Sequence, residues 1–307
     1  MILAGIIAAA SPMRARAQGG HSGAILLELP ASARAMALGG AGVALDGDVA
    51  IFYNPAQIAT VAGAAAGLSV QRYILSSTLG AVSAGARFGP GTIALGAQFL
   101  EYASEPEIVP DEATGGESGR ETGNTIDAGD LAVTVGYGID AGRFRVGAAG
   151  KFVRQRIVEE SGSAVAADLG ISMRVWRSAT VGVAVQNLGT ELEVGSTSAD
   201  LPRIIRVGGA VPFSVIEGVT VMATADVVVP RVGDAVPGGG AEVAWQATPS
   251  LSITGRVGGV AIPGDDDGSP FSAGAAVNGR SLAVDYAFRS FDAVGGATHR
   301  IGVRWWR

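Results

Sequence analysis

Residues able to perform catalysis are sparse in this sequence. Its two histidines, His21 and His299, lie at opposite ends of the chain, and cysteine is absent. A nucleophile–histidine triad and a multi-histidine or thiolate metal site both need such ligands close together. The sequence therefore predicts no catalytic residues, no metal centre and no cofactor, and it favours a protein that is not an enzyme.

Two short motifs could still bind a ligand. The glycine-rich stretch at residues 39–42 resembles a phosphate loop but lacks the preceding strand and the Lys-Ser/Thr pair of a P-loop. Residues 265–267 are consecutive aspartates whose oxygens could bind a divalent cation, but they lack the glutamate spacing of an EF-hand. We therefore interpret the first as a turn and the second as a solvated loop.

The composition is that of a protein whose outer surface does not face water. The chain has 307 residues, of which 48% are hydrophobic and 16% charged, against roughly 25% charged residues in a soluble domain. After the N-terminus no run approaches the roughly 20 apolar residues of a spanning helix. A lipid-facing chain without such helices must close its backbone hydrogen bonds in a barrel. The net charge of −6 argues against nucleic acid as a partner.

From Gly63 onward, apolar residues alternate with small or polar ones, which is the period of a strand. Short, turn-like links alternate with longer ones that carry most of the acidic residues and prolines. The predicted strands are 64–73, 77–88, 91–103, 125–139, 142–157, 163–176, 178–187, 202–213, 217–229, 238–248, 250–261, 270–278, 280–290 and 298–306. The long links are 104–124, 188–201, 230–237, 262–269 and 291–297. An even count with all long links at one end predicts an all-β fold, a transmembrane antiparallel β-barrel of about fourteen strands in the bacterial outer membrane. A β-sandwich could imitate part of the pattern.

The alternation also assigns faces, with the apolar set toward outer-membrane lipid. Charges of both signs fall on the other set, so we expect most of them to pair with one another across the lumen. The lumen-facing candidates are Arg143, Arg145, Lys151, Asp168, Arg174, Arg206, Asp226, Glu242, Arg256, Asp285 and Arg289.

The N-terminal part divides into two units. Residues 1–17 have a short apolar core and a small-x-small pattern at Ala15-Arg16-Ala17, which predicts a signal peptide cleaved before Gln18. Residues 18–62 form a separate segment ahead of the barrel at 63–307. In it, a helical turn at 33–38 should end at Gly39-Gly40, and Asn54-Pro55 should begin a second short helix.

This segment carries a resemblance to a known family. The order Ala33-Arg34-Ala35-Met36, Gly39-Gly40, and Asp48 followed by Asn54-Pro55-Ala56 resembles the N-terminal signature of the PorV/PorQ outer-membrane proteins, which are similar in architecture to the FadL transporters. Further landmarks follow at 167–171, 185–189, 201–203 and 284–288. The resemblance implies a fourteen-stranded barrel whose N-terminal segment is a hatch in the periplasmic mouth. It also implies a part in type IX secretion, with the translocon and the C-terminal signal domains of its cargo as partners.

Three functions stay open at this point. The first is a secretion-linked barrel that binds protein cargo, for which the acidic loop at 104–124 would be a contact surface. The second is a FadL-like transporter of hydrophobic small molecules, against which the charged lumen argues. The third is a structural barrel without a ligand. A plugging segment favours the first two, and the sequence places the secretion role ahead of small-molecule transport.

Overall fold

The computed structural model describes residues 22–73, 76–115, 117–176, 179–261, 268–291 and 296–307. The predicted signal peptide at 1–17, its cleavage site before Gln18, His21 and the three aspartates at 265–267 lie outside the described residues.

Fourteen antiparallel strands close into a barrel, with β1 paired to β18, which confirms the predicted fold. The alternating sequence pattern suits a closed barrel, because each strand buries one face and exposes the other. In chain order the barrel strands are β1 (Ala64–Arg72), β2 (Thr78–Phe88), β3 (Gly91–Glu101), β6 (Ala128–Ala141), β7 (Phe144–Ile157), β8 (Glu160–Arg174), β9 (Thr180–Gly189), β12 (Ile204–Ile216), β13 (Val219–Pro230), β14 (Val236–Thr248), β15 (Leu251–Val260), β16 (Gly268–Asn278), β17 (Leu282–Phe291) and β18 (Gly296–Trp306).

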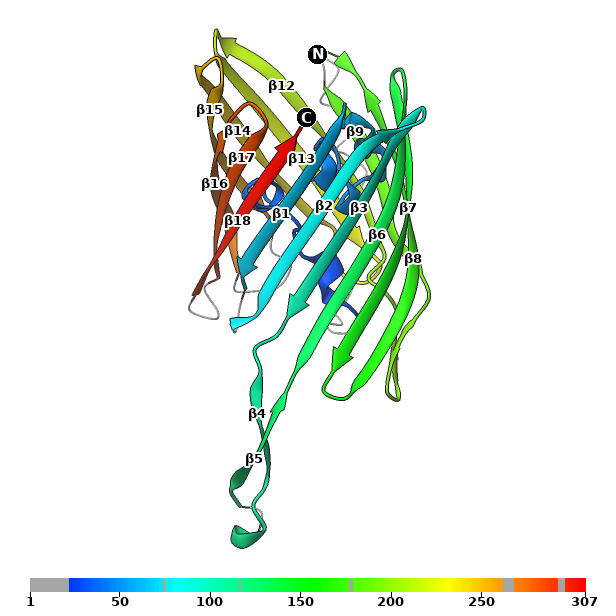
Figure 1. Ribbon diagram of the computed structural model, residues 1–307, viewed down its shortest axis with the longest axis vertical. Coiled ribbons are helices and arrows are strands. Elements are labelled where there is room, and N and C mark those ends of the chain that lie inside the picture. The colour runs from blue at the N-terminus through cyan, green and yellow to red at the C-terminus, as the bar shows by residue number, and fades with distance from the viewer. Residues whose placement is uncertain (1–21, 74–75, 116, 177–178, 262–267, 292–295) are drawn as a thin grey trace.

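Four further strands lie outside the barrel, in two of the predicted loops. The link at 104–124 is largely a hairpin of β4 (Glu105–Pro110) and β5 (Gly119–Ile126), joined through the short 3-10 helix η5 (Glu112–Thr114). β10 (Leu192–Val194) and β11 (Thr197–Ala199) pair in the link between β9 and β12. The β4–β5 hairpin projects from one end of the barrel, opposite the end that holds the C-terminus (Figure 1). Since outer-membrane barrels have their long loops outside, the hairpin marks the extracellular end.

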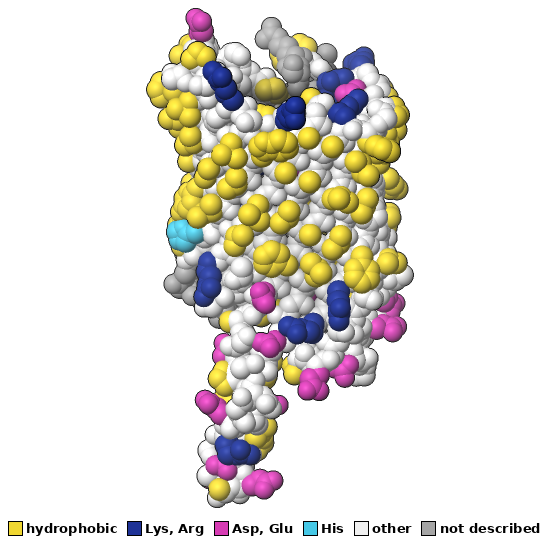
Figure 2. Space-filling view, in the orientation of Figure 1, with side chains coloured by type: hydrophobic (Ala, Val, Ile, Leu, Met, Phe, Trp, Pro, Cys, Tyr) yellow, Lys and Arg dark blue, Asp and Glu magenta, His cyan; other side chains and the backbone are white. Residues whose placement is uncertain are grey.

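The outside of the barrel is an apolar belt. Large hydrophobic side chains are exposed on the barrel strands, among them Leu169 and Val257. In Figure 2 they cover the middle of the barrel, and charged side chains lie near both ends. A closed barrel with such a belt satisfies its backbone hydrogen bonds and meets lipid with hydrocarbon. Fold and belt together place the protein in the bacterial outer membrane.

Residues 22–62, called the lumen segment from here on, lie inside the barrel (Figure 1). They form three 3-10 helices and one α-helix: η1 (Ile25–Glu28), α1 (Ala33–Ala37), η2 (Asp48–Phe52) and η3 (Pro55–Thr60). The side chain of Ser32 accepts a hydrogen bond from the N–H of Ala35, and that of Asn54 from the N–H of Ala56. Pro55 opens η3, as predicted, because its missing N–H costs nothing at a helix start.

Among the residues that the structure describes, no helix combines the length and the apolar character needed to cross a membrane.

The lumen segment extends through much of the depth of the barrel. η1 packs against Leu79 and Leu100, near the extracellular ends of β2 and β3, whereas η3 contacts β6, β7 and β8. The chain then enters β1 at the periplasmic end. The predicted location, in the periplasmic mouth alone, therefore does not cover the part of the segment that contains η1. Leu26 and Leu27 of η1 are buried in an apolar cluster in the extracellular half.

Candidate functional site

A chain of ion pairs holds α1 against the barrel wall. Arg34 donates from Nε and Nη2 to the two carboxylate oxygens of Glu242, at 3.0 and 3.1 Å. Glu242 also accepts from Arg256 at 2.5 Å, and Arg256 donates to Asp285 at 2.7 Å. Asp285 accepts in turn from Arg304, at 2.6 Å. Each carboxylate thus lies between two guanidinium groups, which compensates the cost of burying these charges.

The turn after α1 is held by a buried carboxylate of the wall. Asp226 on β13 accepts hydrogen bonds from the backbone N–H groups of Gly42 and Val43, at 2.6 and 2.8 Å. The preceding Gly39 and Gly40 have positive φ, which explains why glycine occupies both positions. Asp226 thus binds the chain shortly after the two predicted glycines, Gly39 and Gly40.

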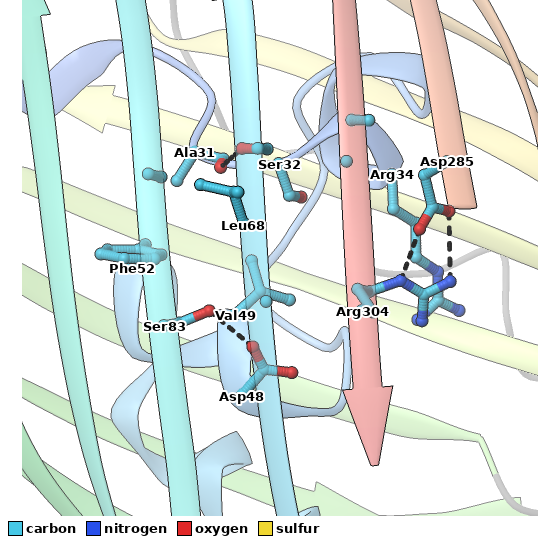
Figure 3. Close-up of a pocket in the computed structure, with 15 residues that line it drawn as sticks. Ala31, Ser32, Arg34, Asp48, Val49, Phe52, Leu68, Ser83, Asp285 and Arg304 are labelled. Atoms are coloured by element: carbon cyan, nitrogen blue, oxygen red, sulfur yellow. Dashed lines mark hydrogen bonds and ion pairs between the residues drawn. The ribbon is translucent and has the colours of Figure 1, made fainter. Parts of the chain in front are cut away.

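The remaining predicted hatch residues also contact the wall or support the segment. Asp48 accepts from the hydroxyl of Ser83 on β2 at 2.5 Å, and Figure 3 shows this bond beside the Arg304–Asp285 pair, on the neighbouring strands of the same wall. Asn54 donates to the carbonyl of Val43 at 2.8 Å. The segment is thus fixed at several separate points.

Lys151 and Asp168 form a second ion pair, away from α1. Their side chains are 4% and 0% exposed, and Lys151 Nζ lies 3.1 Å from Asp168 Oδ2. The backbone of Asn187 has positive φ where the pairing of β8 and β9 shifts register. Its N–H donates to Asp168 at 2.8 Å, and its side-chain oxygen accepts from Lys151 at 2.5 Å. This pair therefore stabilises a bulge in the wall.

Three of the predicted lumen arginines lie at the periplasmic rim. Arg145 donates to Gln57 of η3 at 2.9 Å and to Asp140 at 3.3 Å, so it contacts the lumen segment. Arg174 is 43% exposed and pairs with Asp140. Arg143 is exposed in the turn before β7, where facing no longer follows the period of the strand. Its assignment to the lumen stays a prediction.

A cavity of about 260 Å³, called the outer cavity below, lies between the lumen segment and β12–β15, in the extracellular half. Its walls are mainly apolar, and charged groups flank them. The apolar lining includes Leu29, Pro30, Ile204, Val228, Val236 and Val260. The charged lining consists of Glu28, Arg206, Asp226 and Arg289.

Two buried arginines flank Tyr53 of the lumen segment near this cavity. The guanidinium of Arg206 lies over the Tyr53 ring, 5.5 Å from its centroid, and donates to Gln186 at 2.9 Å. Arg300 is fully buried and donates from Nε to Gln71 at 2.9 Å, while neither of its Nη groups has a hydrogen-bond partner among the residues that the structure describes. Arg300 was not among the predicted residues, although its place in an alternating final strand marks it as inward-facing.

A second space, called the periplasmic vestibule below, has a volume of about 540 Å³. It lies at the ends of β1 and β18, on the other side of the ion-pair chain. Its lining includes Arg34, Glu242, Arg256 and Arg304 together with Thr254 and Trp306. The lumen thus has a mainly apolar space toward the outside and a mixed space, bordered by the ion-pair chain, toward the periplasm.

No protein-family model and no curated protein sequence matches this chain. Solved structures do. The chain is similar to the Ralstonia pickettii toluene transporter TbuX, with a TM-score of 0.61 and 12% identity over 91% of this chain and 99% of that one. It is similar to the Pseudomonas putida toluene transporter TodX, with a TM-score of 0.58 and 11% identity over 90% and 97%. It is also similar to a Pseudomonas aeruginosa FadL homologue, with a TM-score of 0.58 and 10% identity over 90% and 98%.

At this level of identity the likeness concerns the fold, which is that of the FadL-type outer-membrane barrels. The resemblance to the PorV/PorQ family stays a prediction from the sequence.

Proposed function

We propose that this protein lets hydrophobic small molecules pass across the outer membrane and that they bind first in the outer cavity. The observation that carries the proposal is the cavity itself, an apolar-walled space in the extracellular half of a barrel that its own N-terminal segment partly fills. Its volume lies just below the roughly 300–1,000 Å³ of pockets for drug-sized ligands and suits a smaller molecule. The toluene transporters TbuX and TodX, which share the fold, support this substrate class.

The charged lumen was an argument against this function in the sequence, where we also expected most of these charges to pair with one another. Many of its charges pair with one another around α1 and beside the β8–β9 bulge. The extracellular half contains an apolar cluster in which Leu26 and Leu27 pack with Leu79 of the wall and Leu192 of β10. A hydrophobic molecule entering from outside therefore meets apolar side chains first.

Uptake measurements with matched variants test this function. Val228 lines the outer cavity, whereas its neighbour Val227 is 39% exposed on the lipid side of the same strand. In cells expressing the protein, uptake of radiolabelled toluene and of decanoate is measured at concentrations where diffusion through the membrane is slow. Val228→Trp should abolish protein-dependent uptake of whichever compound is carried, and Val227→Trp should leave it intact. Equal uptake in both variants and in cells without the protein would overturn the proposal.

A part in type IX secretion is a second candidate. It is supported by the N-terminal signature and by the β4–β5 hairpin, which projects outside the barrel with six acidic residues and one arginine. In a host that has the translocon, replacing residues 104–126 with a short Gly-Ser linker should then stop release of cargo with C-terminal signal domains. Normal release from cells lacking the whole protein would exclude this role and leave small-molecule passage unaffected.

A further inference from the structure

The inner faces of β14 and β15 connect the outer cavity to the periplasmic vestibule. Four pairs of inward-facing partners follow one another along these strands: Gly238 with Val260, Gly240 with Gly258, Glu242 with Arg256, and Ala244 with Thr254. The first pair lines the outer cavity, and the last two line the vestibule. From Gly238 to Glu242 the strand rises by about 13 Å. Only the second pair belongs to neither space.

At that second pair, the turn that ends α1 lies directly on glycines of the wall. A Cβ atom added to Gly258 would lie 2.3 Å from the backbone nitrogen of Gly39 and 2.5 Å from the carbonyl carbon of Leu38. A Cβ added to Gly240 would lie 2.9 Å from Leu38 Cα. Backbone meets backbone here, so no side chain fills the gap. The missing side chains let a single turn close the space between cavity and vestibule.

One layer closer to the periplasm, Arg34 of α1 holds this turn in place through Glu242. This contact borders the vestibule, where the side chains of Arg34 and Glu242 remain 14% and 13% exposed. η3 packs on the opposite wall through Ile58, which is buried in an apolar cluster. In α1, Met36 and the small side chains of Ala33 and Ala37 pack against Ala287 of β17. The contact of α1 with the wall thus combines the Arg34–Glu242 pair with mostly small side chains.

We propose that molecules leave the outer cavity toward the periplasm along the inner face of β14–β16, and that residues 34–40 are the gate on this route. The proposal rests on the proposed function for the identity of the molecules. In the closed state, Gly39 lies on the glycines of the wall and Arg34 binds Glu242. Opening requires the Arg34–Glu242 pair to separate and the turn to lift off Gly240 and Gly258, which joins the two spaces.

Ion conductance of the purified barrel in a planar bilayer tests the gate without reference to the substrate. Gly258→Ala places a methyl group where the Gly39 backbone lies, so the turn must move. Gly255→Ala is the matched control, because it adds the same group on the same strand with nothing within 4 Å. We expect a shift from a closed to a conducting barrel for Gly258→Ala and a closed barrel for the wild type and for Gly255→Ala. A closed Gly258→Ala barrel that migrates as folded in unheated gels would overturn the gate.

Glu242→Gln gives an independent test that adds no bulk to the wall. It removes the charge that Arg34 binds while it keeps the shape of the side chain, so we expect more frequent openings than in the wild type. It also keeps the test decisive should Gly258→Ala fail to fold, since closed Glu242→Gln barrels would then contradict the gate. If the variants conduct but the wild type takes up neither toluene nor decanoate, the gate is supported and the substrate class is refuted. Uptake that depends on Val228, with closed barrels for both variants, would refute the gate alone.

Discussion

The contact between Asp226 and the turn after α1 gives the sharpest quantitative prediction. In Asp226→Ala, the buried N–H groups of Gly42 and Val43 both lose their acceptor. Leaving a buried donor unsatisfied costs roughly 1–3 kcal/mol, so two of them lower the free energy of local opening by about 2–6 kcal/mol. Since about 1.4 kcal/mol is a factor of ten, amide exchange at these residues should accelerate by roughly 30-fold or more. Hydrogen–deuterium exchange of residues 39–45 in detergent measures this directly.

Asp226→Asn is the matched control for that experiment. Its side-chain oxygen can still accept from both N–H groups, but without the negative charge, so these bonds are weaker. Exchange at Gly42 and Val43 should therefore lie between the wild type and Asp226→Ala. Unchanged exchange in Asp226→Ala, in a barrel that remains folded, would refute the argument that this carboxylate holds the turn.

Three further predictions concern the wall, the belt and the hairpin. Lys151→Met leaves the fully buried Asp168 without its cation and should destabilise the barrel by about 3–5 kcal/mol in urea unfolding. The double variant Lys151→Met with Asp168→Leu should recover much of this loss. Equal stability of the wild type and the single variant would contradict the pairing. Leu169→Arg puts a charge on the lipid face, where Leu169 is 53% exposed, and should lower the stability of the barrel by roughly 2–4 kcal/mol if the site is near the bilayer midplane. No loss of stability in liposomes would place Leu169 outside the belt. In the β4–β5 hairpin, hydrogen bonds from Thr122 and Asn124 hold the pKa of Glu107 below its usual 4.5. A lowered pKa stabilises the folded hairpin at pH values above the usual pKa, and this contribution is lost as the pH falls through the lowered pKa. Amide protection in the hairpin should therefore fall on acidification in the wild type and change less in Glu107→Gln.

The barrel could be predicted from the sequence because its evidence is local. Each strand has its own alternation, and the even count and the distribution of long links follow from adding these local patterns. The starts of α1 and η3 were predictable for the same reason, since Ser32 and Asn54 cap helices only a few residues away.

The contacts of the lumen segment could not be predicted in this way. Arg34 and Glu242 are 208 positions apart, and nothing in either neighbourhood indicates the partner. The outer cavity combines η1 and the residues after it with the extracellular ends of β12 to β15, so it exists only once the barrel is closed. Alternation indicates facing only within strands, so it does not apply to Arg143, which precedes the start of β7.

The location of a bound hydrophobic molecule tests the central claim most directly. Crystals of the protein soaked with bromobenzene would be measured at the bromine absorption edge, so that each bound molecule gives an anomalous peak. The proposed function predicts a peak in the outer cavity, between Leu29, Val228 and Val260, and its loss in Val228→Trp. Peaks confined to the outer, lipid-facing belt, with the cavity empty at saturating bromobenzene, would contradict it.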